Sequence, residues 1–71
     1  MKEKFYSLIK SLRIEAINDY SEGKISKEQL IAVLDDIDYM NEINDREGDT
    51  ERAITYHNGY RDAYVMMRDK W

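Results

Sequence analysis

The sequence has few of the residues that cross-link or interrupt a small fold. It contains no cysteine and no proline, three glycines and one histidine among 71 residues. Disulfides and thiolate zinc sites are therefore excluded, and a single histidine excludes a multi-histidine metal site. No apolar run reaches the roughly 18 residues of a membrane span, and the charged start is unlike a signal peptide. We expect a cytoplasmic protein without metal or cofactor.

The length allows one domain over residues 1–71. A chain this short buries a modest share of its surface and is marginally stable alone. Such chains rely on disulfides, metals, oligomerisation or a very regular helical core. Because the first two are excluded here, a homodimer or a regular helical bundle is expected.

Apolar residues recur at helical spacing in three segments, which predicts an all-α fold made of a helical hairpin and a C-terminal helix. The first segment runs from about residue 3 to Ser21 and ends before Gly23, which suits a left-handed cap. Its predicted buried face comprises Phe5, Leu8, Ile9, Leu12, Ala16 and Tyr20.

The second helix has the clearest start signal in the chain. Ser26 followed three residues later by Gln29 is a capping box, and Ile25 with Leu30 is a hydrophobic staple. We expect the helix to fade between Asn44 and Gly48. Its apolar stripe comprises Leu30, Val33, Leu34, Ile37 and Met40.

The third helix is expected from Asp49 or Thr50 onward. Its stripe comprises Ala53, Tyr56, His57, Tyr60, Ala63, Tyr64, Met67 and Trp71. Asn58-Gly59 is also a hairpin-turn signal, which would make residues 54–65 two strands. The helical pattern continues through the glycine for several turns and favours the helix. Gly59 would cost about 1 kcal/mol there relative to alanine, and it could allow another helix to approach closely.

Charge is unevenly distributed along the chain, although the net charge is only −4. The first 13 residues carry a net +3, from Lys2, Lys4, Lys10 and Arg13 against Glu3. Residues 14–45 carry nine acids against two lysines, and residues 46–71 are balanced. The middle of the chain is therefore strongly acidic.

Acidic residues on the second helix share one face. Asp35, Asp38, Glu42 and Asp45 follow at steps of three, four and three, beside the apolar stripe, so they should be exposed. The cluster is extended by Asp36, Glu47, Asp49 and Glu51, with Arg46 as its one basic residue. This face is either ordinary solvated surface or a binding surface for a basic partner.

Catalytic and metal-binding patterns are weak. An EF-hand loop beginning at Asp36 would place Met40 and Asn41 where an oxygen ligand and a glycine are required. His57 lies at the edge of the third apolar stripe and is expected to be structural. The serines lack the glycine-rich contexts of nucleophile elbows and phosphate loops. We expect no enzymatic activity.

Apolar residues in excess of the three stripes indicate a second buried surface. Six lie outside them, namely Ile14, Ile31, Ile43, Ile54, Val65 and Met66. The aromatic face of the third helix either packs in the core or forms an interface, and it comprises Tyr56, Tyr60, Tyr64 and Trp71. Together these residues predict a homodimer.

Two resemblances add to this interpretation. Residues 20–37, with the turn Gly23-Lys24-Ile25-Ser26-Lys27-Glu28, resemble a short helical hairpin found at the ends of many bacterial proteins. In size, charge and lack of cysteine, the chain resembles small acidic early proteins of bacteriophages that imitate DNA. That resemblance implies an inhibitor in the bacterial host cytoplasm. The implied targets are a sliding clamp, a nucleoid protein or a defence nuclease.

The sequence therefore favours a non-catalytic inhibitor or adaptor whose acidic helix face binds a basic, nucleic-acid-handling protein. It would bind no nucleic acid directly and no membrane. The alternative is a regulatory DNA-binding or assembly module that uses the basic N-terminal segment. Salt-sensitive binding to DNA would distinguish the alternative from a DNA mimic.

Overall fold

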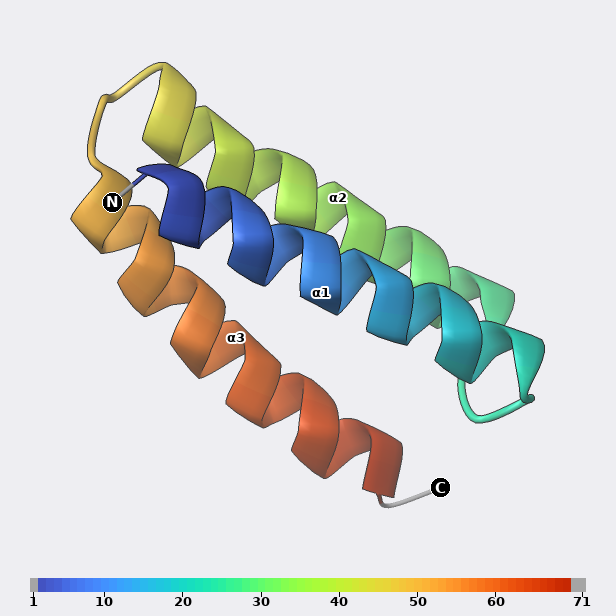
Figure 1. Ribbon diagram of the computed structural model, residues 1–71. Helices are drawn as coiled ribbons and strands as arrows, with labels where there is room; N and C mark the ends of the chain where they lie inside the picture. Colours follow the sequence, from blue (N-terminus) through green and yellow to red (C-terminus); the bar gives the residue numbers. More distant parts are fainter. Residues whose placement is uncertain (1, 70–71) are drawn as a thin grey trace.

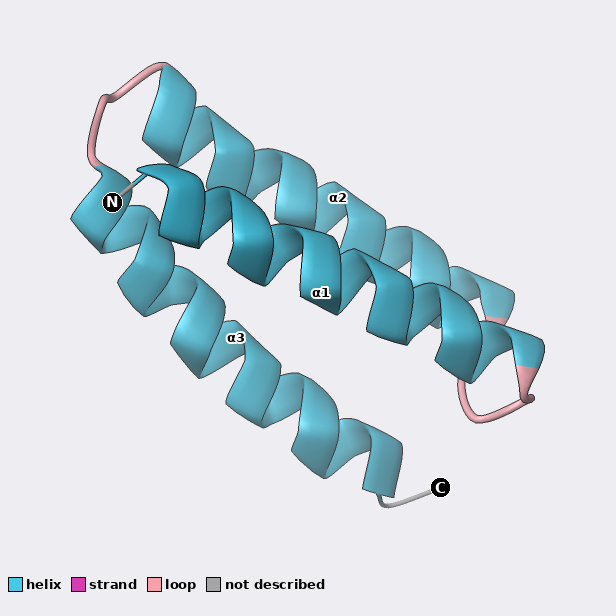
Figure 2. Cartoon of the chain, in the orientation of Figure 1, coloured by secondary structure: helices cyan, strands magenta, loops and turns pink. Residues whose placement is uncertain are grey.

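Three helices account for nearly all of residues 2–69, the part of the chain that the computed structural model describes. They are α1 (Lys2–Ser21), α2 (Lys27–Asp45) and α3 (Thr50–Asp69). Residues 2–69 contain no strand, so the predicted all-α fold is confirmed and the hairpin alternative around Asn58-Gly59 is wrong. Each helix packs against both others in an elongated bundle of 35 × 17 × 17 Å. Figures 1 and 2 show α1 and α3 running in one direction and α2 in the other.

The turns between the helices form as their sequences predict. Gly23 has a φ of +76°, and the amide of Lys24 donates to the carbonyl of Asp19, which closes the end of α1. The Ser26 side chain accepts from the Gln29 amide, and the Gln29 side chain accepts from the Ser26 amide, so the capping box is confirmed. Gly48 has a φ of +66° between α2 and α3.

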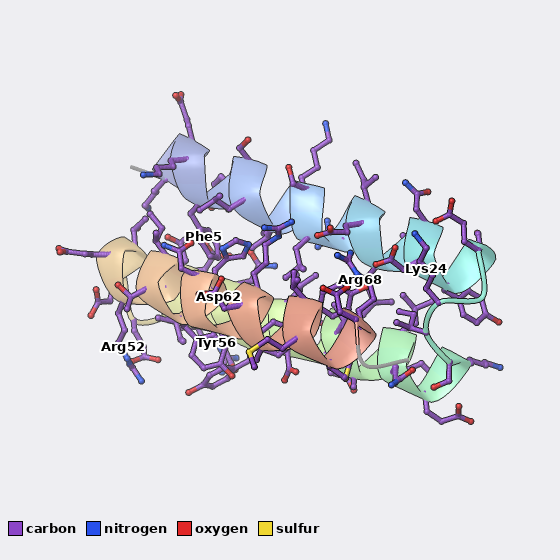
Figure 3. The ribbon with its side chains drawn as sticks, turned by 90° about the horizontal axis from the view of Figure 1, so that it is seen from below. Phe5, Lys24, Arg52, Tyr56, Asp62 and Arg68 are labelled. Atoms are coloured by element: carbon purple, nitrogen blue, oxygen red, sulfur yellow. The ribbon has the colours of Figure 1, made fainter. Side chains whose placement is uncertain are left out.

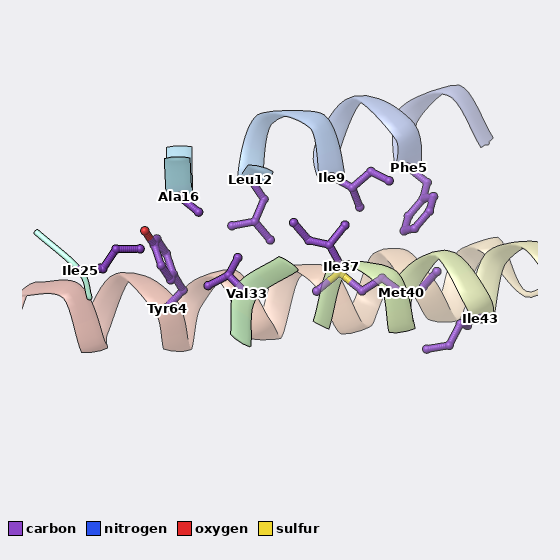
Figure 4. Close-up of a cluster of buried hydrophobic side chains, with 11 residues drawn as sticks. Phe5, Ile9, Leu12, Ala16, Ile25, Val33, Ile37, Met40, Ile43 and Tyr64 are labelled. Atoms are coloured by element: carbon purple, nitrogen blue, oxygen red, sulfur yellow. The ribbon is translucent and has the colours of Figure 1, made fainter. Parts of the chain in front are cut away.

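The core lies along the line where the three helices meet (Figure 4). Its apolar members are Phe5, Ile9, Leu12, Ala16, Ile25, Val33, Ile37, Met40, Ile43, Ala53 and Tyr64. Leu30 and Leu34 are half-buried against it. The helical spacing of apolar residues in the sequence therefore predicts most of the core residues correctly.

Three expectations about the core are wrong at single positions. Tyr20 is exposed, and Asp19 takes its place on the buried face of α1. Tyr56 and Ala63 are exposed on α3. A fixed three–four alternation does not match 3.6 residues per turn, so the buried face drifts slowly around the axis of each helix. Residues at the edge of a predicted stripe can therefore be exposed.

The predicted second apolar surface is wrong for half of its members. Ile43 is fully buried, and Ile54 and Val65 pack against the core. They do so because every helix contacts two neighbours, which widens its apolar arc beyond one stripe. Ile14, Ile31 and Met66 are exposed.

Candidate functional site

The outer face of α2 carries the predicted acidic stripe. Asp35, Asp38, Glu42 and Asp45 are all exposed. They lie on the side of the helix opposite Val33, Ile37 and Met40, which are buried, so exposure follows from the helical period. Ile31 and Tyr39, at 48% and 43% exposure, lie among these carboxylates.

Two arginines neutralise part of the acidic cluster. Arg46 binds Glu42 one turn earlier, with 2.9 Å between Nη1 and Oε1. Arg52 binds Glu47 across the α2–α3 turn, with 2.7 Å between Nη1 and Oε1. Arg52 is five residues from Glu47 and belongs to the next helix, so the sequence analysis, which gave Arg46 as the one basic residue of the cluster, did not include it. Both pairs are exposed, and each contributes only about 0–1 kcal/mol to stability.

Two further acids of the cluster, Asp45 and Asp49, accept hydrogen bonds within the chain. Asp45 accepts hydrogen bonds from the Tyr6 hydroxyl and the Asn44 amide, at 3.1 and 2.8 Å. Asp49 accepts from the Arg52 backbone amide at 3.0 Å and so caps the start of α3. The Asp45 contact with Tyr6 therefore joins the end of α2 to α1, and the Asp49 contact stabilises the first turn of α3.

Asp36 is the only half-buried member of the cluster, since the other seven are exposed. It faces the phenol of Tyr60 on α3. Burial raises the pKa of Tyr60, and the neighbouring Asp36 carboxylate raises this pKa further. Asp36 therefore contributes to helix packing as well as to the acidic surface.

Asp35, Asp38 and Glu51 are the acids of this cluster that remain without a hydrogen bond or ion pair within residues 2–69. Two of them, Asp35 and Asp38, lie on the outer face of α2 beside exposed Tyr39. The available acidic surface is thus smaller than the sequence count suggests, and it is centred on the middle of α2.

The aromatic residues of α3 divide into buried and exposed members. Tyr64 is buried, Tyr60 is half-buried and Tyr56 is exposed. The ring of Tyr56 meets that of Tyr39 edge-on at 5.3 Å between centroids and lies nearly parallel to that of Tyr60 at 6.4 Å. Trp71, the fourth predicted interface residue, lies outside the described residues. The exposed aromatic surface therefore spans α2 and α3.

A polar cluster that the sequence analysis did not predict lies between α1 and α3, and its member Arg68 is labelled in Figure 3. The Tyr64 hydroxyl donates to Asp19 Oδ2 at 2.5 Å, and Arg68 Nη1 donates to the same oxygen at 3.1 Å. Arg68 also donates to Glu15 at 3.0 Å, and Arg61 donates to both oxygens of Glu15 at 3.2 Å. Glu15 and Asp19 are four residues apart on α1, and Arg61 and Arg68 are seven residues apart on α3. Each pair therefore lies on one side of its helix, and this spacing is the signal that the sequence offers for the cluster.

Burial and hydrogen bonding both shift the pKa values of this cluster, and for Asp19 they act in opposite directions. Burial raises the pKa of Asp19, but the hydrogen bonds from Tyr64 and Arg68 outweigh it and hold that pKa below its ordinary value. Burial raises the pKa of Tyr64, and its hydrogen bond to Asp19 adds to the rise. Hydrogen bonds to Asp19 and Glu15 raise the pKa of Arg68. The cluster is satisfied internally, which marks it as structural.

Three of the four basic N-terminal residues share one side of α1, and Lys4 lies on another. Lys2, Lys4 and Lys10 are exposed and Arg13 is half-buried. At about 100° per residue, Lys2, Lys10 and Arg13 lie on one side of α1, whereas Lys4 lies more than a quarter-turn away from all three. DNA-binding helices cluster their lysines and arginines on one face, and three of these four residues do so on α1.

His57 is buried, as expected of a structural histidine. Its Nδ1 lies 3.2 Å from Asn58 Oδ1, while its buried Nε2 has no hydrogen-bond partner in the described part of the chain. Among residues 2–69, no three histidine, cysteine or carboxylate side chains come together as a metal-binding group. An open hollow beside the α1–α2 turn is lined by Gly23, Lys24, Ile25, Ser26, Gln29 and Arg68.

No protein family, curated protein or solved structure matches the chain. None of the helices within residues 2–69 is both long and apolar enough to cross a lipid bilayer. The function is therefore inferred from the chain's own surface.

Proposed function

We propose that the chain is a non-catalytic protein-binding module whose outer α2 face binds a basic surface of a nucleic-acid-handling protein. The observation that carries the proposal is the exposure of Asp35, Asp38 and Glu42 on one side of α2, with Ile31 and Tyr39 among them. Carboxylates attract lysine and arginine, and the exposed apolar groups add desolvated contact.

The geometry of α2 suits competition with DNA. A rise of about 1.5 Å per residue sets successive carboxylates about 4.5–6 Å apart along the helix, and side-chain reach can lengthen this toward the phosphate spacing of a strand. A protein that binds phosphates by charge would accept such a row. We therefore propose inhibition by imitation of DNA, in the manner of small phage proteins, as the mechanism.

Like charges along α2 also have a cost in the free chain. Carboxylates three or four residues apart repel by a few tenths of a kcal/mol per pair. A binding partner that supplies positive charge removes this repulsion. The same acids therefore favour the complex over the free chain, and they accelerate encounter with a basic surface at low salt.

The test compares the parent with a variant that is neutral on this face, Asp35→Asn with Asp38→Asn and Glu42→Gln. A matched control removes three exposed acids elsewhere, through Glu3→Gln, Glu22→Gln and Asp62→Asn. Each protein is used as bait in bacterial lysate, and duplex DNA is added as a competitor. We expect the parent and the control to retain a nucleic-acid-binding protein that DNA displaces, and the neutral variant to lose it.

Equal capture by the parent and the neutral variant would show that the acidic face is ordinary solvated surface. Equal loss from the neutral variant and the control would show that net charge matters and this face does not. Circular dichroism of all three proteins checks that the helices are intact. Binding of duplex DNA by the parent itself would instead support the DNA-binding alternative.

A further inference from the structure

One side of α1 carries exposed and half-buried side chains that the bundle does not bury. They alternate in steps of four and three, the spacing along which helices pack, and we call them the α1 row: Tyr6, Lys10, Arg13, Ile17 and Tyr20. Arg13 lies two residues, or nearly half a turn, from Glu15, which binds Arg61 of α3. The α1 row therefore faces away from α3.

The matching side of α2 carries exposed Ile31 and Asp38 with half-buried Leu34 between them, and we call these three the α2 row. Their steps of three and four repeat the spacing of the α1 row. Asp38 lies two residues, or nearly half a turn, from Asp36, which faces Tyr60 of α3. The α2 row therefore also faces away from α3.

The two rows lie side by side and at matching levels. Asp45, seven residues beyond Asp38 on the same side of α2, accepts the hydrogen bond from Tyr6 at the start of the α1 row. The helices α1 and α2 run in opposite directions (Figure 1). Seven residues from that bond along each helix, Arg13 therefore lies level with Asp38. The apolar ends of the two rows lie level in the same way.

The charges and apolar groups of these rows are not satisfied within the chain. No ion pair among residues 2–69 includes Lys10, Arg13 or Asp38. At the apolar end, Ile17 is 43% exposed and Ile31 is 48% exposed. One face therefore presents apolar surface at one end and unpaired charges of both signs, at one level, toward the other. Such a face is complementary to itself.

We propose that a second copy of this chain docks on this face about a twofold axis parallel to the helices, so that the two hairpins form an antiparallel four-helix bundle. Rotation about such an axis keeps every residue at its own level, so each α1 row lies on the partner's α2 row. Each α1 then runs antiparallel to the partner's α2 as well as to its own. Ile17 meets the partner's Leu34, Tyr20 meets the partner's Ile31, and each contact forms twice.

Charge complementarity favours a second copy as the occupant. Arg13 lies level with the partner's Asp38, and Lys10 lies between the levels of the partner's Asp38 and Asp45. The two Arg13 side chains approach the twofold axis, where each lies between Asp38 of its own chain and the partner's Asp38. The four charges of this layer therefore alternate in sign around the axis and sum to zero.

This dimer goes beyond the proposed function and affects the same surface. It covers Asp38, one of the three carboxylates assigned above to a basic partner, so a second copy and a basic partner would compete for that residue. The dimer is measured with the purified chain alone. Its failure would therefore leave the result of the capture experiment unchanged.

The test reverses two charges one at a time and then mixes the variants. Arg13→Glu sets an acid against the partner's Asp38, and Asp38→Arg sets an arginine against the partner's Arg13. In sedimentation equilibrium over a concentration series, each should raise the dimer dissociation constant roughly tenfold or more. An equimolar mixture should restore a tight dimer, because both contacts between the two different chains regain opposite charges. Mixing leaves the charges within each chain unchanged, so only contacts between chains can explain the recovery.

The matched controls are Lys4→Glu and Asp62→Arg, which make the same reversals of charge at exposed positions outside both rows. We expect both to dimerise like the parent, and circular dichroism checks the helices of every variant. Three outcomes overturn the proposal: a parent that stays monomeric at 8.5 kDa throughout, equal weakening by the controls, or a mixture no tighter than its components.

A second variant tests the apolar end of the face without changing any charge. Ile17→Ser removes the side chain that meets the partner's Leu34 and should weaken the dimer severalfold. Met66→Ser is its control, because Met66 is 63% exposed on α3 and lies outside both rows. Equal dissociation constants for Ile17→Ser and the parent would refute apolar contact at this face.

Discussion

The hydroxyl of Tyr64 donates a hydrogen bond to Asp19 over 2.5 Å and joins α3 to α1 across 45 residues of sequence. Arg68, one turn further along α3, donates to the same carboxylate and lies 5.7 Å from the centre of the Tyr64 ring. The apolar core alone would tolerate small sliding of one helix along another. These directional bonds fix the register of α3 on α1.

Removing the Tyr64 hydroxyl should destabilise the fold without creating a cavity. We expect Tyr64→Phe to lower the free energy of unfolding by about 1.5–3 kcal/mol, because the lost bond is to a charged acceptor. Urea unfolding measures this. Tyr20→Phe is the control, since Tyr20 is exposed and should change the value by less than about 0.5 kcal/mol. Equal effects of the two variants would contradict a special role for the Tyr64 bond.

Acid should weaken the protein through Asp19. Its folded-state pKa is lower than the ordinary 3.8, so its contribution is present above that value and is lost as the pH falls through the folded pKa. We expect the free energy of unfolding to fall below pH about 4 in the parent. Asp19→Asn should start from lower stability at neutral pH and show a shallower decline in acid. A parallel decline in both proteins would assign acid sensitivity to other carboxylates.

The α2–α3 turn depends on a buried hydroxyl. Thr50 donates to Asn44 Oδ1 at 2.6 Å, and both residues are buried. Thr50→Val keeps the shape but leaves the amide oxygen without this donor, which should cost about 1–3 kcal/mol. Thr55→Val makes the same chemical change at an exposed helical position. Thermal unfolding of the two variants should therefore differ clearly, and similar melting temperatures would count against the Asn44 bond.

His57 offers a stabilising substitution. Its Nε2 is buried without a hydrogen-bond partner in the described residues, and a buried unsatisfied polar atom costs about 1–3 kcal/mol. We expect His57→Leu to raise the free energy of unfolding, while exposed Asn58 can bond to water in place of Nδ1. Chemical denaturation checks the sign. A loss of stability would show that the imidazole makes a polar contact that outweighs its burial.

The sequence predicted the helices well because their signals are local. The capping box at Ser26 and the left-handed Gly23 need only neighbouring residues, and both are present in the structure. Apolar periodicity also identified most of the core. The apolar pattern gave the wrong result at Tyr20, which is exposed, while its neighbour Asp19 is buried. Hydrophobicity alone favours burial of the tyrosine over the aspartate.

The candidate site was less predictable because its partners come from distant segments. Exposure of Asp35, Asp38 and Glu42 follows from their place on α2. The contact of Asp36 with Tyr60 and that of Glu47 with Arg52 depend on how α3 packs. Asp19 was overlooked for the same reason, since Tyr64 and Arg68 become its partners only in the folded bundle.

The long separation between Asp19 and its partners also has a kinetic consequence. The α1–α2 and α2–α3 turns close short loops, whereas the Asp19 contacts require α3 to reach α1, which carries a larger loop-closure cost. These contacts should therefore form late, after the apolar faces have met. Substitutions in contacts that form after the transition state mainly accelerate unfolding. The bonds that set the register of α3 would then act chiefly on how long the folded bundle survives, and little on how quickly it forms.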